Sequence, residues 1–173
     1  MIRLADHLGG IDVKRTNLDL YLAGNYHGSG GASGPTMHAK DTEHRIRVVR
    51  EGDIDVAIRA VPPFSSSQEA TRAAWSHFMA VMCSRHFFPD ANHRTAALAF
   101  AIALDRATGT ICFLPKEVIP DLVRASKAVR DRDETGRLKH RRFTVADINR
   151  EEHEYRQVFR RFEGKLVLVP SPP

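Results

Sequence analysis

Nine apolar residues stand in a row at positions 96–104, reading Ala96-Ala97-Leu98-Ala99-Phe100-Ala101-Ile102-Ala103-Leu104. A helix built from these residues would be apolar on every side, which is typical of a helix buried inside a bundle. The run is far shorter than the roughly 20 residues that a membrane-spanning helix needs. We therefore predict a buried helix that ends at Gly109, since glycine readily adopts the conformation that terminates helices.

Helical patterns flank this run on both sides. Upstream, Ser65-Ser66-Ser67-Gln68-Glu69 has the composition of a capping box, which predicts a helix over about residues 67–85. This helix would bury large apolar residues that recur every three or four positions, namely Trp75, Phe78, Met79 and Met82. Downstream, we predict helices over about residues 116–129 and 144–163, and an edge strand in the tail from Lys165 to Pro173. The fold class is therefore mainly α.

Residues 45–59 have a different pattern. Apolar and charged residues alternate on both sides of Arg50-Glu51-Gly52-Asp53, with Ile46 and Val48 before it and Ile54, Val56 and Ile58 after it. Period-two spacing around a glycine-containing turn predicts a short β-hairpin. The competing interpretation is a helix over residues 40–51.

The composition fits one globular domain. A chain of 173 residues with 42% hydrophobic residues can bury a single core. Residues 24–35 have the composition of a loop, so we expect residues 1–40 to form an irregular segment that packs on the domain and residues 41–173 to form the domain itself.

Charge and cysteine content narrow the classes of partner and compartment. The net charge of +5 would suit an anionic partner, but the 26 basic and 21 acidic residues are interspersed, as on an ordinary solvated surface. Cys83 and Cys112 lie in apolar surroundings without a C-x-x-C spacing, which predicts reduced thiols in a cytoplasmic protein. The N-terminus carries Arg3 and Asp6 and has no apolar core of a secretory signal, so we expect no membrane partner.

The candidate site is residues 86–94, called here the motif segment, which reads His86-Phe87-Phe88-Pro89-Asp90-Ala91-Asn92-His93-Arg94. If the buried helix starts near Asn92 as its N-cap, its unpaired N–H groups form an anion site. Arg94 adds donors for phosphate oxygens, and Asp90 offers an oxygen ligand for Mg²⁺. A neutral His86 can accept the proton of an incoming hydroxyl.

Two apolar side chains of the motif segment have structural roles. Phe88 is apolar and would anchor the segment in the core between the two helices that flank it. Ala91 keeps the turn before the helix small.

The spacing His86-x-Phe88-x-Asp90-Ala91-Asn92-x-Arg94 resembles the signature of the Fic/Doc family, H-x-F-x-(D/E)-(A/G)-N-(G/K)-R. The resemblance implies a helical bundle with the motif between two central helices, and a β-hairpin flap for which residues 45–59 are the candidate. It implies transfer of AMP or a phosphoryl group from ATP and Mg²⁺ to a hydroxyl of a target protein. His86 would be the general base and Asp90 the metal ligand.

The nucleotide phosphates would lie against residues 91–94, with Asn92 and Arg94 as the ligands that the resemblance implies. His93 stands where family members that transfer AMP have glycine and the Doc branch of protein kinases has lysine. Ala97 stands where many AMP transferases have a second arginine. Both reactions therefore stay open. His93 itself is a phosphate contact, a selectivity element or an ordinary first-turn residue.

Many Fic proteins inhibit themselves through a glutamate that pairs with the motif arginine. The partial match here is Glu69, about 25 Å from His86 along one helix and too far to reach Arg94. We therefore expect restraint by a separate antitoxin protein, as for a toxin.

Two other kinds of protein, a zinc protein and a nucleic-acid-binding protein, compete with this transferase. His77, His86 and His93 could suggest zinc, but His77 and His86 would point in opposite directions on one helix. The basic stretch from Arg130 to Arg142 raises the alternative of a non-enzymatic protein that binds nucleic acid. It lacks interleaved aromatic residues for base stacking, so a solvated loop is the expectation.

Overall fold

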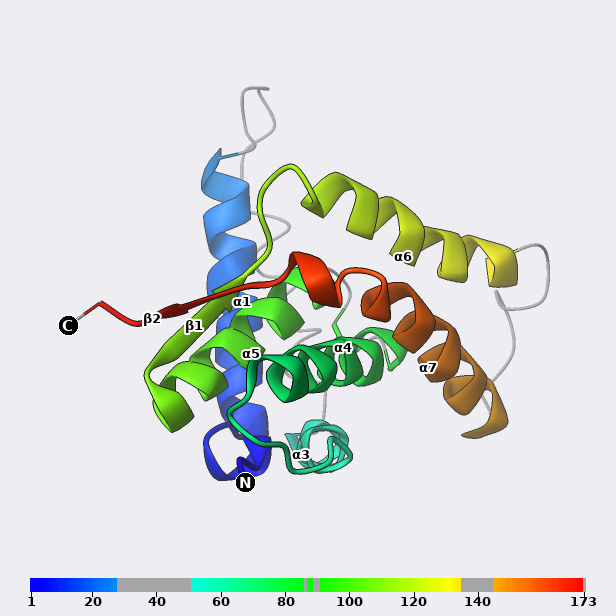
Figure 1. Cartoon of the computed structure of the whole chain (residues 1–173). Coiled ribbons are helices and arrows are strands. Elements are labelled where there is room, and N and C mark those ends of the chain that lie inside the picture. Colours follow the sequence, from blue (N-terminus) through cyan, green and yellow to red (C-terminus); the bar gives the residue numbers. More distant parts are fainter. Residues whose placement is uncertain (28–50, 86, 89–90, 135–144, 173) are drawn as a thin grey trace.

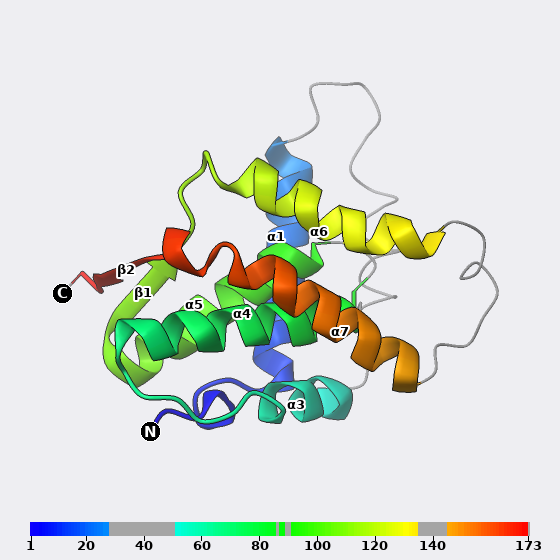
Figure 2. The same cartoon turned by 45° about the vertical axis from the view of Figure 1, so that its right-hand side comes forward.

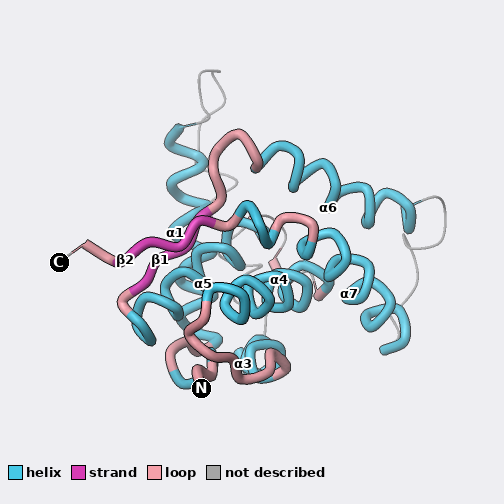
Figure 3. Tube along the Cα trace, in the orientation of Figure 1, coloured by secondary structure: helices cyan, strands magenta, loops and turns pink. Residues whose placement is uncertain are grey.

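The computed structural model describes residues 1–27, 51–85, 87–88, 91–134 and 145–172 of the chain. The fold is mainly α, as predicted, with two short strands on one side (Figure 1; Figure 3). The elements in chain order are η1 (Leu4–Asp6), α1 (Gly10–His27), α3 (Glu51–Arg59), α4 (Gln68–Ser84), α5 (Asn92–Thr108), β1 (Thr110–Phe113), α6 (Ile119–Glu134), α7 (Val145–Arg160), η2 (Glu163–Lys165) and β2 (Val167–Pro170).

Helices α4 and α5 occupy the centre of the molecule, and the prediction for both is confirmed. Ser67 caps α4 by accepting a hydrogen bond from the backbone N–H of Ala70 at 3.3 Å. Gly109 ends α5 in a left-handed conformation with φ of +63°, which costs glycine little. Helix α5 is not buried on every side, however, because Leu98 is 42% exposed.

The core centres on α4, which packs against α5 and against α7, and α7 runs along α4 (Figure 2). Trp75 of α4 contacts Phe159 of α7 edge-on, with ring centroids 6.0 Å apart. Phe78 of α4 packs on Phe100 of α5 at 5.8 Å. These large apolar rings are fully buried, so hydrophobic burial holds the three helices together.

Helix α1 corrects the prediction of an irregular segment over residues 1–40, because residues 10–27 are helical. The helix does pack on the domain, against α3 and α5. Its buried face includes Thr16 and Asn17, and the Asn17 side chain donates a hydrogen bond to the hydroxyl of Thr95 on α5 at 2.8 Å. These polar residues interrupt the apolar periodicity that would have revealed the helix. Residues 28–40 lie outside the described part of the chain.

Helix α3 shows that the predicted β-hairpin over residues 45–59 is wrong for residues 51–59. The alternation of apolar residues misled because Ile54 and Ile58 are spaced for one face of a helix as well as for one face of a strand. Both are buried together with Ala57, whereas Val56 is 57% exposed, which is the helical pattern. Residues 45–50 lie outside the described part of the chain.

The strands instead join two distant parts of the chain. β1 pairs antiparallel with β2, with Thr110 opposite Pro170 and Phe113 opposite Val167, which confirms the strand predicted in the tail. Figure 3 shows the pair beside the helices. Beyond β2, Ser171 donates its backbone N–H to the carbonyl of Gly109 at 2.8 Å, and this bond fixes the tail to the end of α5. None of the described helices has both the length and the apolar character required to cross a membrane.

Candidate functional site

The motif segment connects the end of α4 to the start of α5, as expected for a site between two central helices. Phe88 is only 3% exposed and belongs to the hydrophobic core, so its predicted role as an anchor is confirmed. His86, Pro89 and Asp90 lie outside the described residues. The general base at His86 and the magnesium ligand at Asp90 therefore stay predictions.

The start of α5 differs in one respect from the prediction. Asn92 was expected to be the N-cap, but the N-cap is Ala91, and Asn92 is the first residue of the helix. Ala91 has φ of +60°, a left-handed conformation that is uncommon outside glycine. Its small side chain is also buried, which leaves little room for a larger residue at this turn.

The Asn92 amide group bonds back to the motif segment. Its Oδ1 accepts a hydrogen bond from the backbone N–H of Phe88 at 3.0 Å, and its Nδ2 donates to the carbonyl of Phe88 at 2.5 Å. The amide uses one of its two N–H donors and one lone pair of its oxygen in these bonds, which tie the start of α5 back to Phe88. A contact between Asn92 and phosphate stays a prediction.

His93 connects α5 to α6. Its Nε2 lies 2.5 Å from the hydroxyl of Ser126, which is fully buried, and its ring packs beside Phe159 with centroids 6.2 Å apart. This contact favours a positioning role for His93 over an idle one. Whether His93 also contacts phosphate is untested.

Arg94 presents the exposed cation of the site. It lies in the first turn of α5, where the helix begins with Thr95 donating its N–H to the carbonyl of Ala91 at 2.8 Å. No hydrogen bond or ion pair joins the Arg94 side chain to another described residue. A guanidinium at a helix start adds to the positive end of the helix dipole, which suits an anion.

An apolar cleft of about 390 Å³ has Arg94 in its lining. It lies between the exposed face of α5, the segment from β1 to the start of α6, and parts of α1 and α4. Its lining residues are Leu20, Trp75, Met79, His93, Arg94, Ala97, Leu98, Ala101, Cys112, Phe113, Leu114, Ile119, Leu122, Val123 and Leu166. A cleft of this size and character is what small-molecule sites usually offer.

Charged residues of α7 lie near Arg85, the residue that precedes the motif segment. Glu152 of α7 accepts a hydrogen bond from Arg156 at 3.0 Å and lies 4.0 Å from Arg85, the residue before His86. Arg156 also contacts Nε2 of His77 at 2.5 Å, so His77 accepts this bond in its neutral form. Burial, and then the nearby Arg156, lower the pKa of His77.

The structure also bears on the metal hypothesis. His77 has a hydrogen-bond partner in Arg156, as expected for a histidine satisfied within the fold. Among the residues that the structure describes, no three His, Cys, Asp or Glu side chains are grouped so that they could hold an ion. Cys83 and Cys112 are both buried free thiols, and burial raises the pKa of Cys112 to about 12.

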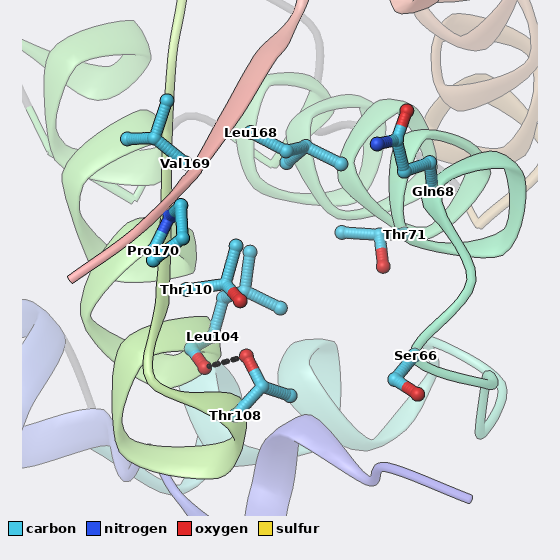
Figure 4. Close-up of a pocket in the computed structure, with 9 residues that line it drawn as sticks. All are labelled: Ser66, Gln68, Thr71, Leu104, Thr108, Thr110, Leu168, Val169 and Pro170. Carbon is cyan, nitrogen blue, oxygen red and sulfur yellow. Dashed lines mark hydrogen bonds between the residues drawn. The ribbon is translucent and has the colours of Figure 1, made fainter.

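A second cavity, of about 290 Å³, lies at the far ends of α4 and α5 (Figure 4). Its lining residues are Ser66, Gln68, Thr71, Leu104, Thr108, Thr110, Leu168, Val169 and Pro170. The Thr108 hydroxyl donates to the carbonyl of Leu104 at 2.8 Å, and none of the lining residues that the structure describes is charged. The length of α4 separates this cavity from the motif segment by about 24 Å, so it does not take part in the predicted phosphate chemistry.

Sequence reasoning missed the partners that position the site. Ser126 is 33 residues from His93, and nothing in the sequence pairs the two. The Glu152–Arg156 pair has the four-residue spacing of a helical ion pair and could have been recognised in the sequence. Its connection to Arg85 requires the docking of α7 on α4.

Comparisons of this chain with known protein families, with curated proteins and with solved structures found no match.

Proposed function

We propose that this protein is a Fic/Doc-type transferase that moves AMP or a phosphoryl group from Mg²⁺-ATP to a hydroxyl of a target protein. The observation that carries the proposal is the exposed Arg94 in the first turn of α5, within a segment whose sequence resembles the family signature. The proposal includes a separate antitoxin protein. It also includes a cytoplasmic location, which the two buried free thiols support.

The described residues fit a site for phosphate. The guanidinium of Arg94 would hold phosphate oxygens beside the N–H groups that begin α5. Asn92 stabilises this arrangement, because its hydrogen bonds to Phe88 fix the start of the helix relative to Phe88. Phosphoryl chemistry depends mostly on positioning and charge stabilisation, and these residues supply both.

The remaining roles belong to residues beside this turn. His86 would accept the proton from the target hydroxyl as its oxygen bonds to phosphorus, and Asp90 would hold the magnesium ion. The ion, when bound, neutralises charge on the phosphate oxygens. Loss of pyrophosphate corresponds to AMP transfer and loss of ADP to phosphoryl transfer.

The test is incubation of the protein and a cell lysate with ATP labelled at either the α- or the γ-phosphate. Label retained on protein from the α-position means AMP transfer, and label from the γ-position alone means phosphoryl transfer. His86→Ala should abolish labelling, with His153→Ala, an exposed histidine on α7, as its control. Arg94→Ala should reduce it at least about tenfold, with the exposed Arg124→Ala on α6 as control. Unchanged labelling in the His86 variant would refute the mechanism.

A further inference from the structure

The cleft beside Arg94 gathers apolar side chains that the fold leaves in contact with solvent. Leu98 is 42% exposed, Phe113 48% and Ile119 45%, and all three line this cleft. They come from α5, β1 and α6, three consecutive elements of the chain. A contiguous exposed apolar surface is costly in water and commonly marks a binding site.

The polar groups of the lining are few. Among the described lining residues, Arg94 is the one with a permanent charge, and Nε2 of His93 is occupied by Ser126. Cys112 contributes a thiol, which is a weak hydrogen-bonding group. The described lining therefore combines an exposed cation, Arg94, with mostly apolar side chains.

We propose that this cleft binds a small amphiphilic anion, a molecule with an unbranched apolar chain and one carboxylate. The carboxylate pairs with the exposed guanidinium of Arg94. The chain lies against Leu98, Phe113 and Ile119 and removes their exposed surface from water.

The same lining argues against a nucleoside as the occupant. A base edge and a ribose carry several hydrogen-bonding groups, and each would lose its water on entering the cleft. Among the residues that the structure describes, the side chains that line it include no Ser, Thr, Asn, Gln, Asp or Glu to replace that water. Buried groups without partners weaken binding, whereas an alkyl chain has none to satisfy.

Binding of such an anion would regulate the motif segment. The carboxylate and a nucleotide phosphate would both need the guanidinium of Arg94, so the anion would compete with ATP. This consequence rests on the proposed function, whereas the binding itself does not.

Binding is tested by calorimetric titration of the full chain with hexanoate, octanoate and decanoate, each kept below the concentration at which it aggregates. Each added methylene should lower Kd about fourfold, or about 15-fold per step in this series, until the cleft is filled. Octan-1-ol should bind more weakly than octanoate, and Arg94→Gln should remove most of that difference.

Two matched variants locate the site. Leu98→Gln should weaken decanoate binding about fivefold, because it replaces a wall of the cleft on the surface of α5. Val56→Gln makes the same type of change at an exposed residue of α3 outside the cleft and should leave Kd unchanged.

Two results would overturn the inference. One is no saturable binding of decanoate up to about 1 mM. The other is binding that Leu98→Gln and Val56→Gln weaken equally, which means non-specific adsorption to apolar surface. Failure here leaves the labelling experiment with ATP unaffected, and an inactive enzyme would still be expected to bind decanoate, so the two proposals fail separately.

Discussion

Replacement of Asn92 by alanine tests whether this side chain closes the turn before α5. The variant loses two hydrogen bonds to the backbone of Phe88, each worth about 1 kcal/mol net. Phe88 is buried, so its N–H and C=O groups are poorly placed to recover water, and we expect a total loss of about 2–3 kcal/mol. With a typical dependence on urea of about 2 kcal/mol per molar, the midpoint should fall by about 1 M.

The assay is urea unfolding followed by circular dichroism, with two comparison variants. Asn92→Asp keeps an acceptor for the Phe88 N–H but loses the donor to its carbonyl, so its free energy of unfolding should lie between those of the wild type and Asn92→Ala. Gln68→Ala is the control, because Gln68 is the first residue of α4, is exposed, and its side chain makes no hydrogen bond to a described residue. It should change stability by less than about 0.5 kcal/mol.

The role assigned to Asn92 would be refuted if Asn92→Ala and Gln68→Ala had the same free energy of unfolding. A variant that kept full stability but lost nucleotide binding would instead show that Asn92 acts on the phosphate.

Three further predictions concern stability and access. The pKa of His77 is lowered in the folded state, so stability present above about pH 6.5 should be lost as the pH falls below that value, and His77→Gln should flatten this part of the profile of unfolding free energy against pH. Cys112 should resist a thiol reagent at pH 8 until the protein unfolds, because burial raises its pKa to about 12; rapid stoichiometric labelling of native protein would contradict this. Asn17→Ala should lower the free energy of unfolding by about 1–3 kcal/mol, measured in urea, because it leaves the buried hydroxyl of Thr95 without its donor.

The elements recognised from sequence are those whose signals are local. Ser67 begins α4 and Gly109 ends α5, and each acts through neighbours a few residues away. The failures have physical reasons of two kinds. α1 buries polar Asn17 against a partner 78 residues away, and α3 spaces Ile54 and Ile58 in a way that suits either a helix or a strand.

The candidate site likewise has some features that the sequence reveals and others that depend on packing. The motif segment, its anchor Phe88 and the exposed Arg94 could be recognised from sequence, since spacing and residue type carry the information. The contact of His93 with Ser126 and the apolar cleft could not, because they form only when α6 docks beside α5. An all-apolar run predicted burial on every side, and only the packing shows which side stays open at Leu98.

The left-handed conformation of Ala91 limits which residues this position can accept during evolution. A side chain in this conformation costs about 1–2 kcal/mol relative to glycine, and the site is too closed for a longer one. Glycine would remove that strain but also the buried methyl group, worth about 0.8 kcal/mol, and it would raise the entropy of the unfolded chain by about 0.4–1 kcal/mol, so the two residues nearly balance. Backbone geometry alone therefore admits alanine and glycine here, the two residues that the Fic/Doc signature allows at this position.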